Sequence, residues 1–163
     1  MLSVIKKCVA HDEILSTYPV MRQLRPSIKD EDYLGIVTAM QETDRYQLVG
    51  AYTEDGQCVA VAGIRFRRSL FRGGERELYV DDLVTDEAHR STGIGHDMMN
   101  WLKTECKKEG CVGLVLDSGL TRSDAHRFYK REGMESTALH FYRPKSPEPP
   151  EQDGGAAPSF LKK

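Results

Sequence analysis

The stretch that decides the fold is YVDDLVTDEAHRSTGIG, residues 79–95 of a chain of 163 residues. Its β-branched and acidic first half is typical of a strand, and its glycine-containing second half opens an amphipathic helix. The first amides of such a helix have no intrahelical acceptor, and they attract anions. Two glycines let a bulky anion approach the backbone, and an arginine adds a bidentate cation. The sequence therefore predicts a pyrophosphate-binding loop made of Arg90, Ser91, Thr92, Gly93, Ile94 and Gly95.

Two other nucleotide-binding motifs do not fit these residues. A dinucleotide-binding fingerprint needs a third glycine or alanine where Met98 stands, and its strand runs directly into the first glycine. A Walker loop needs Gly-Lys-Ser/Thr, which the sequence lacks. The alternative that stays open is an ordinary helix-entry turn.

The same stretch resembles the acyl-CoA-binding signature of the GNAT acetyltransferase superfamily. The resemblance continues through VGLVLDSG (residues 112–119) and AHRFYKREGM (residues 125–134), in the family's order and spacing, and it spans residues 3–143. It implies a single-domain α/β fold with a mixed, mostly antiparallel central sheet and helices on both faces. It also implies that the fourth and fifth strands splay apart, and that acetyl-CoA is the co-substrate.

Hydrophobic periodicity and turn residues divide the chain into the elements of this fold. Pro19 is expected to break or kink the first helix, because it lacks the N–H that an interior helical position donates. The GNAT domain is expected to fill residues 1–143, followed by a proline-rich, disordered tail at 144–163. Expected strands lie at residues 3–9, 46–53, 58–67, 75–85, 112–116 and 135–142, and expected helices at 11–24, 28–41, 93–108 and 123–131.

The bulk properties exclude several classes of protein. A net charge of −2 and a pI of about 6.2 lack the basic excess of a nucleic-acid binder. The four cysteines form no CxxC pair and no zinc pattern, so they are expected to be reduced, in the cytoplasm, and no metal site is predicted. No apolar run approaches the ~18 residues of a membrane span, and the N-terminus does not resemble a signal peptide.

The resemblance assigns the cofactor arm to the backbone at the end of the fourth strand. A strand edge offers unpaired donors to an amide-rich ligand, and one amide can polarise the acetyl carbonyl. By resemblance these amides belong to Leu83, Val84 and Thr85. Many members carry an asparagine contact where this chain has Arg122, so Ser123, His126 or Arg127 is expected to replace it. The alternative is that Leu83 and Val84 are only core side chains.

Two adjacent carboxylates, Asp81 and Asp82, interrupt the same strand. Buried carboxylates are costly unless they are paired or used, and an amine with a pKa of about 10 must lose a proton before it attacks a thioester. Neighbouring strand residues point to opposite faces, so only one carboxylate is expected in the cleft. The resemblance to polyamine-acetylating members implies that Asp81 is the base or the ligand of the substrate amine. The alternatives are a solvated position at the sheet edge and a salt bridge to Arg65 or Arg67 on the neighbouring strand.

Tyr129 lies in an apolar stripe of the last helix. A tyrosine on such a stripe is most often a core residue. In the family that this segment resembles, a tyrosine at this place protonates the departing CoA thiolate, so the resemblance implies that Tyr129 is the general acid.

Together these residues predict an acetyl-CoA-dependent N-acetyltransferase that transfers the acetyl group directly to a primary amine in a ternary complex. Small amines, similar to polyamines or aminoalkylphosphonates, are favoured because the sequence shows no sign of an extended peptide-binding groove. The acceptor is expected near Tyr33 and His140. Neither a nucleic acid nor a membrane is an expected partner, and a homodimer is compatible with the sequence. The alternatives are a non-catalytic acyl-CoA sensor or interaction domain, and a protein N-acetyltransferase.

Overall fold

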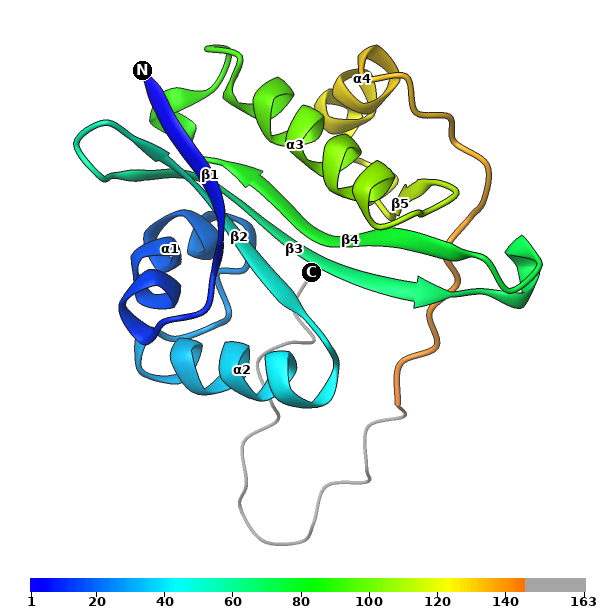
Figure 1. Ribbon diagram of the computed structural model, residues 1–163, viewed down its shortest axis with the longest axis horizontal. Helices are drawn as coiled ribbons and strands as arrows, with labels where there is room; N and C mark the ends of the chain where they lie inside the picture. The colour runs from blue at the N-terminus through cyan, green and yellow to red at the C-terminus, as the bar shows by residue number, and fades with distance from the viewer. Residues whose placement is uncertain (146–163) are drawn as a thin grey trace, which may run out of the picture.

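The computed structural model describes residues 1–145, which form one five-stranded sheet in the order β1-β2-β3-β4-β5 (Figure 1). The pairs β1–β2, β2–β3 and β3–β4 are antiparallel, and β5 pairs parallel with β4. The predicted α/β class with a mixed, mostly antiparallel sheet is therefore confirmed. The strands are β1 (Leu2–Cys8), β2 (Gln47–Thr53), β3 (Cys58–Arg68), β4 (Arg76–Thr85) and β5 (Leu114–Leu116).

Helices cover both faces of the sheet (Figure 1). One face carries α1 (His11–Leu24) and α2 (Asp30–Thr43), and the other carries α3 (Ile94–Lys108) and α4 (Ser123–Arg131). Two short 3-10 helices, η1 (Leu70–Arg72) and η2 (Glu87–His89), lie in the connections before and after β4.

Each face of the sheet has its own hydrophobic core. On the α3 side, fully buried side chains include Ile64, Leu78, Met98 and Leu102. On the α1/α2 side they include Ile14, Tyr33 and Leu48. Burying side chains of this size stabilises a fold by roughly 1.5–3 kcal/mol each, so the sheet is held firmly from both faces.

A β-bulge in β4 changes which side chains face which helices. In the β3–β4 ladder Gly63 pairs with Asp82 and Ile64 with Val80, so Asp81 is an extra residue on β4. Before the bulge, Val80 packs in the α3-side core; after it, Val84 packs in the α1/α2-side core. In a regular strand Val80 and Val84 would face the same side of the sheet, because side chains alternate; the extra residue places them on opposite sides.

Strands β4 and β5 separate where the bulge begins. Their parallel ladder ends at the pair Val80–Leu116. From Asp81 to Thr85, β4 keeps β3 on one side and has no strand on the other among the described residues. The predicted splay is confirmed.

Helix α1 is not broken at Pro19: it continues from His11 to Leu24, because Pro19 and Leu15, whose carbonyl loses its donor, both lie on the exposed face. One expected strand is wrong. The strand predicted at residues 135–142 is absent. Leu139 and Phe141 are 65% and 88% exposed, and β5 offers only a three-residue edge. An alternating pattern favours a strand, but a strand forms only where a neighbour completes its ladder.

The tail predicted from residue 144 onward lies, from residue 146, outside the described residues. Within residues 1–145, no helix has both the length and the apolar character needed to cross a bilayer.

Candidate active site

The predicted pyrophosphate-binding loop lies between β4 and α3 with its amides free. Gly93 is the N-cap of α3 at φ 93°, and Ser91 also has a positive φ of 63°. Within the described chain, the backbone amides from Ser91 to Gly95 have no hydrogen-bond acceptor. A row of free amides at a helix N-terminus is the arrangement that binds phosphate groups.

The two glycines of this loop differ in what they permit. A Cβ on Gly93 would meet nothing within 4 Å, so a side chain there is disfavoured by the positive φ. A Cβ on Gly95 would lie 3.5 Å from the Phe128 ring and the Thr85 hydroxyl. Gly93 therefore sets the shape of the loop, whereas Gly95 lies against α4. Arg90 is exposed, and its Nε makes only a long 3.4 Å bond to the carbonyl of Thr85.

Helix α1 holds the η2 segment that leads into this loop. Gln23 Nε2 donates to Asp86 Oδ1 over 2.8 Å, and the Glu87 amide donates to Gln23 Oε1 over 3.0 Å. His89 Nδ1 lies 2.7 Å from Asp86 Oδ2. The hydrogen bond from Gln23, followed by that from His89, holds the pKa of Asp86 below its usual value. Thr92 Oγ1 completes the network by donating to the carbonyl of His89 over 2.6 Å.

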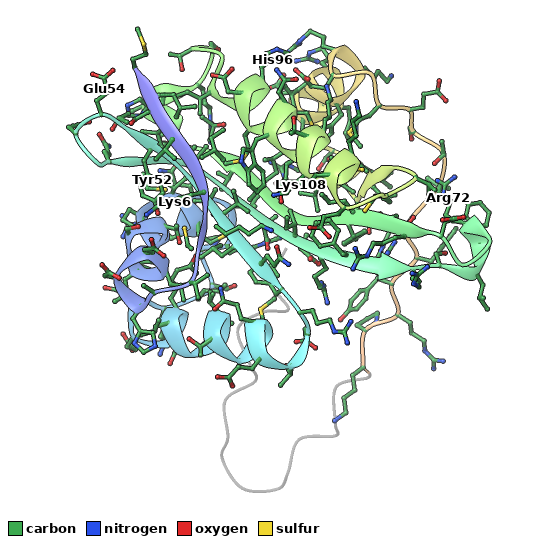
Figure 2. All side chains as sticks on the ribbon, in the orientation of Figure 1. Lys6, Tyr52, Glu54, Arg72, His96 and Lys108 are labelled. Atoms are coloured by element: carbon green, nitrogen blue, oxygen red, sulfur yellow. The ribbon has the colours of Figure 1, made fainter. Side chains whose placement is uncertain are left out.

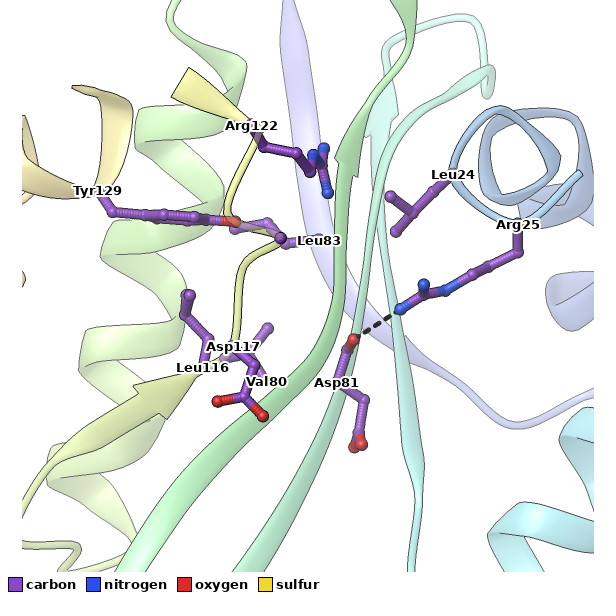
Figure 3. A pocket seen from close by; sticks show the side chains of 10 residues that line it. Leu24, Arg25, Val80, Asp81, Leu83, Leu116, Asp117, Arg122 and Tyr129 are labelled. Carbon is purple, nitrogen blue, oxygen red and sulfur yellow. Dashed lines mark hydrogen bonds between the residues drawn. The ribbon is translucent and has the colours of Figure 1, made fainter. Parts of the chain in front are cut away.

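A cleft of about 270 Å³ opens where β4 and β5 separate (Figure 3). Its walls come from the end of α1, from β4, from β5 and the loop after it, and from α4. Of the site residues predicted from the sequence, the cleft brings together Asp81, Leu83 and Tyr129. Arg122, which was not predicted to bind the ligand, lies beside them. The lining residues are Leu24, Arg25, Val80, Asp81, Leu83, Leu116, Asp117, Gly119, Arg122 and Tyr129.

The backbone of β4 presents two of the three predicted amides to this cleft. The amide of Asp86 donates to the carbonyl of Val59 on β3. Amide direction alternates along a strand, so the Val84 amide also faces β3. The amides of Leu83 and Thr85 then face the side from which β5 has departed. Leu83 and Thr85 are thus placed to pair with a ligand, and the Val84 amide is not.

Tyr129 is half-buried, and its ring packs edge-on against Phe128 with centroids 5.5 Å apart. Burial raises the pKa of its hydroxyl, against a smaller opposing effect of Arg122. The hydroxyl therefore stays protonated at neutral pH, as a proton donor requires.

Helix α4 is braced on α3 by a buried carboxylate. Glu132 Oε1 lies 2.7 Å from Nδ1 of His96, which Figure 2 shows beside α4, and Oε2 lies 2.9 Å from Nζ of Lys103. Burial opposes ionisation, yet the bonds from His96 and Lys103 leave the pKa of Glu132 lowered. This brace fixes the helix that carries Tyr129.

Both carboxylates of the acidic pair contact groups on the α1/α2 side of the sheet. Asp81 accepts two hydrogen bonds from Arg65, one of them 2.8 Å from Nε to Oδ2. Asp82 accepts from Arg25 Nε over 2.7 Å and from the buried Tyr46 hydroxyl over 2.9 Å. The expectation of opposite faces is wrong, because the bulge at Asp81 breaks the alternation.

Arg25 also ties the bulge to α1. Its Nη2 donates to the carbonyl of Asp81 over 3.0 Å. On the other side of Asp82, Gly63 leaves room for Tyr46, since a Cβ there would lie 1.9 Å from the tyrosine oxygen. Arg25 was not predicted from the sequence, because its role depends on where α1 ends in space.

The loop after β5 matches the expectation only in part. Ser123 is exposed at the start of α4, and His126 Nε2 lies 2.9 Å from the carbonyl of Gly119 in its own loop. Neither lines the cleft, whereas Arg122 does. Tyr33, expected near the acceptor, is buried and bonds Thr17 over 2.8 Å. Asp117, which was not predicted, lines the cleft and contacts Tyr79 and His140.

The family model described as "Acetyltransferase (GNAT) family" matches residues 10–134 of this chain. The chain belongs to the GNAT acetyltransferase family. It is an N-acetyltransferase whose co-substrate is acetyl-CoA. The free amides of the loop and the unpaired edge of β4 suit the pyrophosphate and the amide-rich arm of this co-substrate.

Individual relatives agree with this assignment. The "Uncharacterized N-acetyltransferase YhdJ" of Bacillus subtilis is 34% identical over 125 residues, which cover 77% of this chain and 86% of that protein. The "Aminoalkylphosphonate N-acetyltransferase" of Salmonella typhimurium is 32% identical over 62 residues, 38% of this chain and 40% of that protein. The fold is similar to that of AAC(6')-Iy in complex with a CoA bisubstrate analogue, with a TM-score of 0.74 and 15% identity, over 89% of this chain and 99% of that one.

Proposed function

We propose that this protein transfers the acetyl group of acetyl-CoA directly to the primary amine of a small molecule within a ternary complex. One observation carries the proposal: Asp81 and Tyr129 line the same cleft from β4 and α4, at the point where β4 and β5 separate. An anionic group for the amine and a proton donor for the thiolate then lie on two walls of one cavity. The lining contains no cysteine that would form an acetyl-enzyme.

The amides of Leu83 and Thr85 would pair with the cofactor arm in place of a strand. The Leu83 amide, which lines the cleft, would also donate to the acetyl carbonyl oxygen as negative charge develops on it. The loop from Arg90 to Gly95 would hold the pyrophosphate. These backbone contacts would position the cofactor and stabilise the negative charge on the acetyl oxygen, and side chains would transfer the protons.

Asp81 is assigned to the acceptor amine. Both of its carboxylate oxygens already accept hydrogen bonds from Arg65. Of its two expected roles, that of ligand for the ammonium group therefore fits better than that of proton acceptor. Asp82, bonded to Arg25 and Tyr46, is assigned to holding the bulge.

Tyr129 is assigned to the leaving group. Its burial favours the protonated hydroxyl, which can donate to the CoA sulfur as the C–S bond breaks.

The acceptor that we favour carries an anionic group besides its amine. The guanidinium groups of Arg25 and Arg122 point into the cleft from opposite sides (Figure 3). Arg122 has no side-chain partner in the described part of the chain. A free guanidinium binds phosphonate, phosphate or carboxylate in a bidentate manner. The name of the Salmonella relative points to the same class of amine.

A panel of acceptors tests this function. The release of free thiol from acetyl-CoA would be followed with polyamines, aminoalkylphosphonates, amino sugars with and without phosphate, and lysine or N-terminal peptides. We expect turnover of at least one small amine, with an acidic amine preferred over its neutral counterpart. CoA binding by calorimetry without thiol release for any amine would instead indicate a sensor, and preference for a peptide would indicate a protein acetyltransferase.

A further inference from the structure

A carboxylate–imidazole pair joins one residue of the cleft lining, Asp117, to His140, which lies outside the lining. Asp117 follows β5 directly, and its Oδ2 lies 3.2 Å from Nδ1 of His140. The same oxygen accepts a 2.5 Å hydrogen bond from the Tyr79 hydroxyl. Asp117 also lines the cleft. A residue of the segment after α4 is thereby tied to the cleft wall.

Asp117 lies at the end of the cleft that holds Asp81, the residue assigned to the acceptor amine. Figure 3 shows the carboxylates of Asp117 and Asp81 at the same end of the pocket, with the Tyr129 hydroxyl toward the other end. A proton taken up at one end and donated at the other matches the needs of amide formation, because the amine loses protons and the thiolate gains one.

The other candidate bases are engaged. Asp81 accepts two bonds from Arg65, and Asp82 bonds Arg25 and Tyr46. His140 differs from them, because Nδ1 faces Asp117 while Nε2 has no partner among residues 1–145. Its side chain is 66% exposed, so a proton received on Nε2 can pass to solvent. Histidine is also the side chain that ordinarily titrates near neutral pH.

We propose that His140, oriented by Asp117, is the catalytic proton acceptor for the acceptor amine; this rests on the small-molecule acetyl transfer proposed above. The ammonium group gives one proton to His140 Nε2 and becomes a neutral amine. Its nitrogen lone pair then forms the C–N bond to the thioester carbonyl carbon. The C–S bond breaks, Tyr129 protonates the thiolate, and the second amine proton replaces the one that Tyr129 gave. The proton on His140 leaves to solvent.

Several titratable and charged groups lie around the imidazole. Asp117 faces it directly, and Tyr79 donates to the same carboxylate oxygen. Burial, with the hydrogen bond to Asp117, raises the pKa of Tyr79 to about 12, so Tyr79 stays protonated throughout the working range. The Arg67 guanidinium lies 4.1 Å from the centroid of the Tyr79 ring, and the charge of Asp81 adds to that of Asp117 in raising the pKa of Tyr79.

The test compares two acceptors that differ in basicity. His140→Gln keeps a polar side chain of similar reach but does not titrate, and Asp117→Asn removes the charge that orients the ring. For an amine of pKa about 10 assayed at pH 7, we expect His140→Gln to lower kcat/KM by ~100-fold, within the range for loss of a general base. For an analogue of pKa about 7, which is already half deprotonated, the loss should shrink to roughly 3-fold or less.

The ascending limb of the pH–rate profile should move to higher pH in His140→Gln, and Asp117→Asn should give the same pattern more weakly. Acetyl-CoA affinity should not change in either variant. The matched control is His11→Gln, on the exposed first residue of α1, which should behave as the wild type.

Equal losses with both amines, or an unmoved pH–rate profile, would overturn the assignment of His140 while leaving the proposed function intact. Turnover of no amine by the wild-type protein would overturn both.

Discussion

The two halves of β4 share one strand but differ in their neighbours. Residues 76–80 pair with β3 on one side and β5 on the other, and Leu78 is fully buried. Within residues 1–145, the segment 81–85 pairs only with β3, and all of its residues except Val84 are partly exposed. One extra residue, Asp81, separates the two halves. The difference teaches that a single bulge can end a core ladder and begin a binding edge without interrupting the strand.

The same bulge also shapes the proposed site. It places the side chains of Asp81 and Asp82 on one side of the sheet and leaves the amides of Leu83 and Thr85 without strand acceptors. Unpaired backbone groups are costly unless water or a ligand satisfies them. The paired half should therefore contribute mainly to stability, and the splayed half mainly to binding and turnover.

The largest expected effect compares one leucine from each half. Leu78→Ala removes a fully buried side chain, so it should lower the free energy of unfolding by ~2–5 kcal/mol. Leu83→Ala removes a half-exposed side chain and should cost about 1 kcal/mol, while raising KM for acetyl-CoA. Urea denaturation and steady-state kinetics measure the two quantities. Equal losses of stability would mean that the halves do not differ in burial.

The next effect concerns Asp81. If it holds the acceptor ammonium, Asp81→Asn should lower kcat/KM for the amine by ~100-fold, or about 2.7 kcal/mol, and leave the Kd of acetyl-CoA unchanged. Asp82→Asn is the matched control. It should weaken the bond to Arg25, lower the melting temperature and change kcat/KM by only a few-fold. The reverse pattern would exchange the roles of the two residues.

Beyond the splayed half lies the pyrophosphate-binding loop, where affinity alone should change. Arg90 is exposed and, within residues 1–145, its side chain makes only a 3.4 Å bond, so Arg90→Ala should not affect folding. It should weaken acetyl-CoA binding by ~1.5–3 kcal/mol, as expected for a hydrogen bond to a charged group. Calorimetry measures this, with Arg68→Ala on the β3–β4 hairpin as the control. Unchanged affinity in Arg90→Ala would remove Arg90 from the loop's function.

The smallest effect is expected at Tyr129. Tyr129→Phe keeps the ring and its contact with Phe128, so the free energy of unfolding should change by no more than ~0.5–1.5 kcal/mol. Turnover should fall at least ~10-fold, about 1.4 kcal/mol of transition-state stabilisation. An acyl donor with a more acidic thiol should reduce this loss. A destabilised variant with normal turnover would make Tyr129 a core residue only.

The parts of the structure that depend on neighbours along the chain could be predicted from the sequence. The hairpins, helix α3 and the free amides around Gly93 follow from local patterns of apolar residues, glycines and turn residues. The bulge at Asp81 does not, because it is a mismatch between β4 and β3 that appears only when the two strands are paired.

The same reason explains the missing strand and the unpredicted site residues. The segment around Leu139 and Phe141 alternates like a strand but has no ladder to join. The ion pairs of Arg25 with Asp82 and of Asp117 with His140 link residues that are distant in sequence. Within residues 79–95, the type and spacing of the residues were enough to predict a phosphate-binding loop. The contacts of Arg25 and His140 depend instead on where α1 and the chain after α4 lie in space.

The difference between the halves of β4 can be measured directly by amide hydrogen exchange. In the free protein, the amide of Leu78 donates to the carbonyl of Gly113 and should exchange slowly. The amide of Leu83 faces away from β3, has no strand acceptor within residues 1–145 and should exchange fast. Saturating acetyl-CoA should slow the Leu83 and Thr85 amides at least ~10-fold, because the cofactor arm would replace the departed strand. Continued fast exchange of Leu83 in the complex would contradict the account of a cofactor bound along the splayed half of β4.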